Sequence, residues 1–161
     1  MKPTLLIMLL LSLLTAPPSW AASPAAPNLS EVSLVSAGGA PFLADQIGRQ
    51  QGVLLVLISK GNPGGIKILD FLATLEPQFP VDRLLVVVAG ADERVFKAIS
   101  GKYPKLAASW YRDPEGALAK KLKLGVTPAV LGVRNATVAW NLFGIADEEL
   151  LEKTMRGWLN R

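Results

Sequence analysis

Two uninterrupted apolar runs dominate the hydrophobic pattern of this chain. Residues 53–58 and 84–89 consist of leucine, isoleucine, valine and alanine, without a polar residue in either run. Strands that are buried on both faces of a sheet have this composition, and a helical pattern between two such strands implies parallel pairing. The sequence therefore predicts an α/β domain whose central sheet is covered on both faces.

Four helices are predicted from N-capping residues that precede apolar positions at helical spacing. Asn62 is a favoured cap and Pro63 stands at the favoured first helical position. The later helices are expected to be capped by Asp92, Asp113 and Asp147. The predicted buried faces are, in order, Ile68, Leu69, Leu72, Leu75 and Phe79; Val95, Phe96 and Ile99; Leu118 and Leu122; and Leu151, Met155, Trp158 and Leu159.

Weaker patterns predict the remaining strands. Residues 31–35 alternate between apolar and polar positions and are interpreted as an edge strand, whereas residues 41–47 are expected to form a short helix or loop. An antiparallel hairpin is predicted from residues 129–133 and 137–141, with a tight connection at Arg134 and Asn135. Together with the parallel pair, this hairpin makes the predicted sheet a mixed one.

The first 22 residues have the pattern of a secretory signal peptide. Lys2 supplies a short basic segment, residues 5–14 are apolar, and Ala21 and Ala22 offer a cleavage site. An uncleaved membrane anchor is the weaker alternative, because a span needs about 20 apolar residues. We therefore expect an exported, periplasmic protein that contacts the membrane only transiently, through this peptide. A flexible leader over residues 23–30 and one domain over residues 31–161 should follow.

Composition removes several kinds of chemistry. The 161 residues include no cysteine and no histidine, and the formal net charge is +4. Disulfides, thiol nucleophiles, soft metal ligands and a near-neutral general base are therefore absent. We expect no metal and no cofactor. The cluster of Lys120, Lys121 and Lys123 has no interleaved aromatic residues and suits a solvated helix end, so nucleic acid is not an expected partner.

Four segments, in this order and spacing, resemble the thioredoxin fold, and within it the TlpA-like and peroxiredoxin-like (redoxin) branch. They are the strand–turn–helix around Gly61-Asn62-Pro63-Gly64-Gly65, the segment 111–119, the segment 124–130 with Thr127-Pro128, and Phe143-Gly144 before the last helix. The resemblance covers residues 31–160. It implies a thioredoxin-like three-layer α/β/α sandwich with a central mixed sheet and a redoxin-type N-terminal extension.

The resemblance also implies where a site would lie. Asn62 and Gly65 match the positions of the two family cysteines, so the Cys-x-x-Cys motif is missing, and Pro128 matches a proline that is cis in the family and faces that motif. Disulfide exchange and thiol peroxidase chemistry need a thiolate and are excluded. The candidate binding residues are Asn62, Pro63, Gly64, Gly65, Thr127 and Pro128. The competing interpretation is purely structural: a helix cap with two permissive glycines, and a proline that only shapes the sheet.

The sequence leaves three functional hypotheses open. The leading one is a redox-inactive protein of the cell envelope, not an enzyme, that binds an envelope protein as an assembly, maturation or accessory factor. The second is an enzyme with a thiol-free site in the same cleft, which would use Ser59, Lys60 or a carboxylate. The third is a structural subunit of a secretion or electron-transfer complex.

Overall fold

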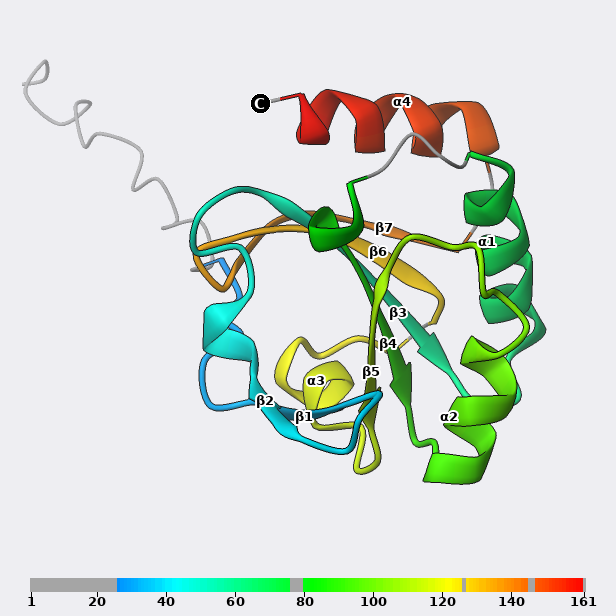
Figure 1. The fold of residues 1–161 in the computed structure, drawn as a ribbon. Helices are drawn as coiled ribbons and strands as arrows, with labels where there is room; N and C mark the ends of the chain where they lie inside the picture. Colours follow the sequence, from blue (N-terminus) through cyan, green and yellow to red (C-terminus); the bar gives the residue numbers. More distant parts are fainter. Residues whose placement is uncertain (1–25, 76–79, 126, 145–146, 161) are drawn as a thin grey trace, which may run out of the picture.

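The computed structural model describes residues 26–75, 80–125, 127–144 and 147–160. Strands and helices alternate in the middle of the described chain, which begins with two consecutive strands and has two more before its last helix (Figure 1). The strands are β1 (Ser33–Ser36), β2 (Pro41–Leu43), β3 (Val53–Ser59), β4 (Leu84–Ala89), β5 (Ser109–Asp113), β6 (Ala129–Arg134) and β7 (Thr137–Phe143). The helices are α1 (Pro63–Thr74), α2 (Glu93–Ser100), α3 (Ala117–Lys121) and α4 (Glu148–Leu159), with short 3-10 turns at Ala44–Gln46 and Val81–Arg83.

All of these strands join one mixed sheet in the order β2-β1-β5-β4-β3-β6-β7. The pairs β3–β4 and β4–β5 are parallel, whereas β3–β6, β6–β7, β1–β5 and β1–β2 are antiparallel. The parallel pairing that the two apolar runs predicted is therefore confirmed. Because parallel strands end at the same edge of a sheet, the turns after β3, β4 and β5 lie together.

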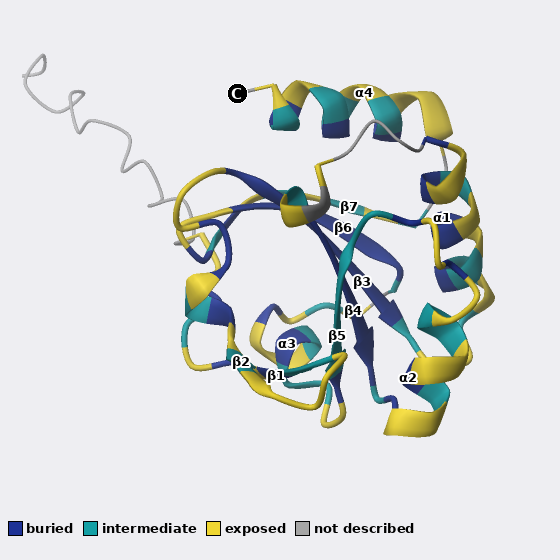
Figure 2. Ribbon diagram, viewed as in Figure 1, coloured by how far each residue is buried: buried dark blue, intermediate teal, exposed yellow. Residues whose placement is uncertain are grey.

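The sheet separates two hydrophobic clusters, so the predicted three-layer α/β/α sandwich is confirmed (Figure 2). One cluster contains the buried faces of α1, α2 and α4, and the other contains Leu118 of α3 and the N-terminal segment. Strand β3 contributes alternate residues to each side: Leu54, Val56 and Ile58 to the first cluster, and Val53, Leu55 and Leu57 to the second. This double burial explains its continuous apolar sequence.

The N-terminal part of the sheet differs from the prediction. β1 is not an edge strand, because it pairs with β2 on one side and with β5 on the other. The edge is β2, which forms where a short helix or loop was expected, and the 3-10 turn follows it. Phe42 of β2 packs on the ring of Tyr111, with 4.5 Å between the ring centroids. This contact with a residue far along the chain fixes β2, and local sequence does not encode it.

Two turns are corrected in detail. The β6–β7 turn is at Asn135 and Ala136, one residue later than predicted, and both have positive φ (50° and 54°). α3 begins after Gly116 in a left-handed conformation, not at Pro114. The buried Asp113 carboxylate still caps this helix, because it accepts hydrogen bonds from the backbone N–H groups of residues 117 and 118 at 2.9 Å each. The predicted caps at Asn62, Asp92 and Asp147 are confirmed.

The end of the predicted flexible leader is packed onto the domain. Leu29 is fully buried, and its N–H donates to the carbonyl of Ala136 at 2.7 Å. Val138 of β7 donates in turn to the carbonyl of Pro27 at 2.9 Å. The leader therefore contacts the start of β7. The predicted extension of the first helix face to Phe79 lies outside the described residues.

Candidate functional site

The turn between β3 and α1 meets the loop that precedes β6. The Asn62 side chain joins them, because its Nδ2 donates to the Thr127 carbonyl oxygen at 2.7 Å and lies 3.2 Å from Thr127 Oγ1. The Thr127–Pro128 peptide bond, which lies immediately before β6, is cis. We call the six residues Asn62, Pro63, Gly64, Gly65, Thr127 and Pro128 the corner.

Asn62 uses both ends of its amide inside the molecule. Its Oδ1 accepts a hydrogen bond from the Gly64 N–H at 2.8 Å and so caps α1, while its Nδ2 donates across the corner to Thr127. A thiolate at a helix N-terminus would be stabilised by the same N–H groups and by the helix dipole. Here a neutral amide fills that place and binds the opposite loop.

The two corner glycines allow close packing. A Cβ at Gly64 would lie 2.9 Å from Cδ of Pro128, and a Cβ at Gly65 would lie 3.0 Å from Cβ of Ile58. Gly65 and Pro128 are buried, whereas Pro63 is exposed and Asn62, Gly64 and Thr127 are half-buried. Of the candidate binding residues, Gly65 and Pro128 therefore support the corner from beneath, and the other four form its surface.

Ser59 belongs to the same hydrogen-bond network. The Thr127 hydroxyl donates to Ser59 Oγ at 3.0 Å, at the end of β3. Lys60 is exposed, and its aliphatic stem lies over Gly90. Among the described residues, the hydrogen-bond partner of the Ser59 side chain is thus a threonine hydroxyl and not a base or a carboxylate. The arrangement holds the corner together and does not resemble an activated nucleophile.

Sequence reasoning placed Phe143 in the segment before the last helix but not among the candidate binding residues. Phe143 is 49% exposed and pairs with Ala129 across the hairpin, while the N–H of Gly144 donates to the carbonyl of Pro128 at 2.9 Å. An exposed aromatic ring therefore stands beside the corner. A regular hairpin from the turn would have placed Leu142 opposite Ala129, but an irregularity at Gly132 and Val133 shifts the register by one residue.

The clearest electrostatic perturbation lies away from the corner. Burial raises the pKa of the Tyr103 hydroxyl to about 12, and its 2.9 Å hydrogen bond to Asp70 acts in the same direction. Within the described ranges, no three acidic side chains gather in a way that could hold a metal ion. Among the helices that the structure describes, none has both the length and the apolar character needed to cross a membrane.

Comparison with known proteins finds similarity only at the level of structure. No protein-family model and no curated protein matches the sequence. A thiol-disulfide isomerase from Corynebacterium glutamicum matches with a TM-score of 0.63 and 14% identity, over 84% of this chain and 97% of that one. A thio-disulfide isomerase from Thermus thermophilus gives a TM-score of 0.62 and 16% identity, over 83% and 96%.

A secreted disulfide oxidoreductase from Mycobacterium tuberculosis is similar as well, with a TM-score of 0.60 and 16% identity over 78% of this chain and 95% of that one. The matched structures are thioredoxin-like proteins of the type that the sequence resembled. The chain has the thioredoxin fold and carries no cysteine in it.

Proposed function

We propose that this protein is a redox-inactive, exported member of the thioredoxin fold that binds another envelope protein through the corner. The observation that carries the proposal is the Asn62 amide, which stands at the helix N-terminus and hydrogen-bonds Thr127 on the opposite loop. The corner geometry is thus retained by a side chain that cannot exchange electrons. A partner would recognise the shape of the corner. The protein would then act on that partner as an assembly, maturation or accessory factor.

The absence of a thiol supports a binding role over an enzymatic one. Disulfide exchange begins with attack by a thiolate, and the chain has no cysteine to supply it. The hydroxyl of Ser59, at the end of β3, accepts a hydrogen bond from Thr127. We infer that the corner recognises its partner and leaves it chemically unchanged.

The surface of the corner suits a protein partner. Pro63 is exposed, Thr127 is half-buried, and Phe143 adds an aromatic side chain that is 49% exposed. Aromatic side chains are enriched among the residues that contribute most to protein interfaces. A rigid turn fixed by hydrogen bonds also loses little conformational entropy when a partner binds.

Two observations support export. The first 22 residues have the pattern of a signal peptide. Similar solved structures include the secreted oxidoreductase of Mycobacterium tuberculosis and an exposed lipoprotein thioredoxin of Streptococcus pneumoniae. An extracytoplasmic location is therefore part of the proposal.

A capture experiment from envelope extract tests the binding surface. The immobilised protein should retain a discrete partner, and Thr127→Arg should lose it, because the arginine would project from the half-buried centre of the corner. Thr74→Arg is the matched control, since the same change is made at the exposed far end of α1 and should leave capture intact. Retention of every captured protein by Thr127→Arg would refute the role of the corner.

A further inference from the structure

The two edges of the sheet differ in how well they are protected against pairing with another strand. β2 has only three residues and begins with Pro41. β7 has seven residues, Thr-Val-Ala-Trp-Asn-Leu-Phe, with neither a charge nor a proline. Natural edge strands are usually short, charged, interrupted by proline or bulged. Apart from its bulge, β7 lacks these protections.

Much of the outer side of β7 has no partner strand in the part of the chain that the structure describes. Among the described residues, Asn28 bridges to Thr137 and Pro27 accepts a hydrogen bond from Val138, but no described strand pairs beyond that point. Alternate residues of an antiparallel strand turn their backbone groups outward, so Asn141 and Phe143 present backbone groups with no partner strand among the described residues. Free backbone groups of this kind favour the addition of another strand.

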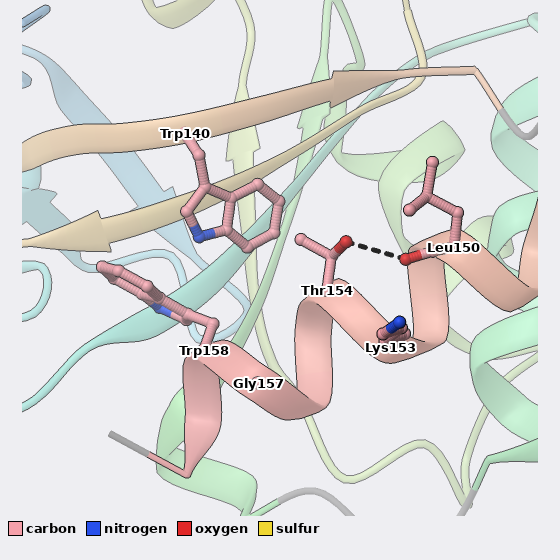
Figure 3. Close-up of a pocket in the computed structure, with 6 residues that line it drawn as sticks. All are labelled: Trp140, Leu150, Lys153, Thr154, Gly157 and Trp158. Atoms are coloured by element: carbon pink, nitrogen blue, oxygen red, sulfur yellow. Dashed lines mark hydrogen bonds between the residues drawn. The ribbon is translucent and has the colours of Figure 1, made fainter.

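A hollow of about 350 Å3 lies beside this edge, between β7 and α4 (Figure 3). Its lining residues are Trp140, Leu150, Lys153, Thr154, Gly157 and Trp158. Leu150 is 51% exposed, whereas a Cβ built at Gly157 would meet no atom within 4 Å. One helix therefore presents a projecting leucine and, two turns later, an empty space. A projection and a space on one patch are what a self-complementary interface needs.

We propose that the free edge of β7 and this hollow form the interface of a symmetric dimer, with a second copy of this chain as the occupant. A two-fold axis across the edge pairs the two β7 strands antiparallel and places the two α4 helices side by side in opposite directions. Leu150 of each copy then enters the space beside Gly157 of the other. Pairing of β7 with itself closes after two copies, whereas pairing with β2 would give an open chain of molecules.

The charges on α4 are complementary in this arrangement. Asp147 caps the helix and Glu148 and Glu149 lie in its first turn, whereas Lys153 lies at its middle and Arg156 in its last turn, where Arg156 is also paired with Glu152 at 2.6 Å. Antiparallel helices bring the acidic first turn of one copy towards the last turn of the other, which carries Arg156. The helix thus supplies both signs of charge, as it supplies both the projection and the space.

Analytical ultracentrifugation of the purified protein tests the dimer. We expect a reversible monomer–dimer equilibrium over about a hundredfold range of concentration, because association follows mass action. Gly157→Leu should fill the space and weaken dimerisation at least about tenfold, as should Leu150→Ala by removing the projection. The double variant exchanges the positions of large and small side chains and should recover most of the affinity.

Folding and the proposed corner site are controlled separately. Gly157→Leu is on an exposed helix position with free space, so unfolding experiments should show no loss of stability. Thr127→Arg, which tests the corner, should leave the dimer unchanged. A monomer at every concentration, or a dimer that neither single variant weakens, would overturn the proposal. So would protection of the outward-facing amides of Asn141 and Phe143 from hydrogen exchange in a monomer, since another occupant would then cover the edge.

Discussion

The replacement of Asn62 by alanine probes the bond that holds the corner together. Asn62→Ala removes the cap of α1, which is worth about 1 kcal/mol. It also removes the 2.7 Å hydrogen bond to the Thr127 carbonyl, which contributes about another 1 kcal/mol. The sum of the two contributions gives an expected fall of about 2 kcal/mol in the free energy of unfolding.

Urea unfolding followed by circular dichroism measures this loss, and two variants separate its parts. Asp92→Ala is the matched control, because Asp92 caps α2 with one 2.8 Å hydrogen bond to Val95 N. It should cost about 1 kcal/mol. Asn62→Ser keeps a capping oxygen but cannot reach Thr127 with a donor, so it should also cost about 1 kcal/mol.

Equal destabilisation by Asn62→Ala and Asp92→Ala would refute a contribution from the bond across the corner. In that case the amide would act as a cap alone, and the bond across the corner would contribute nothing measurable. Equal stability of Asn62→Ser and the wild type would lead to the same conclusion. Unchanged m-values are required for the comparison, because they show that the unfolded state is the same.

Two further predictions follow from the packing and the electrostatics. Gly64→Ala should destabilise the protein by about 1–3 kcal/mol in the same urea experiment, because the new Cβ would overlap Pro128. Gly157→Ala is the control: its Cβ would have free space, so this change should stabilise the protein by up to about 1 kcal/mol. Equal effects of the two changes on stability would refute the contact between Gly64 and Pro128. The pKa of Tyr103 is about 12 in the folded protein, against 10.0 for an unperturbed tyrosine. The stability that the neutral Tyr103 hydroxyl provides is therefore complete below pH 10 and is lost as the pH rises through 12. The wild type should therefore lose up to about 2 kcal/mol more than Tyr103→Phe over this interval, and parallel pH profiles would contradict the assignment.

The elements that the sequence predicted well are those whose signals are local. The apolar run of residues 53–58 can be buried only on both faces of a sheet, and it forms β3. Asn62 before Pro63 is a local cap signal, and the structure contains that cap. Such signals depend on the residue itself and a few neighbours, so they can be interpreted without knowledge of the tertiary structure.

The elements that were missed depend on contacts between distant residues. β2 is stabilised by pairing with β1 and by the ring contact of Phe42 with Tyr111. The exposure of Phe143 follows from a one-residue shift in the hairpin register, and such irregularities have no reliable sequence signal. The hydrogen bond that Asn62 donates to Thr127 joins two residues that are 65 positions apart in the sequence. Local patterns do not predict such a contact, and only the resemblance to a known fold predicted that the two loops lie together.

The most direct test of a binding corner is photo-crosslinking in the native host. A photoreactive residue in place of Pro63, which is exposed beside Asn62, should give one discrete protein adduct. Thr127→Arg in the same chain should abolish that adduct, and the same probe at the exposed Lys105 should not produce it. No adduct at position 63, or the same adducts at both positions, would contradict the account.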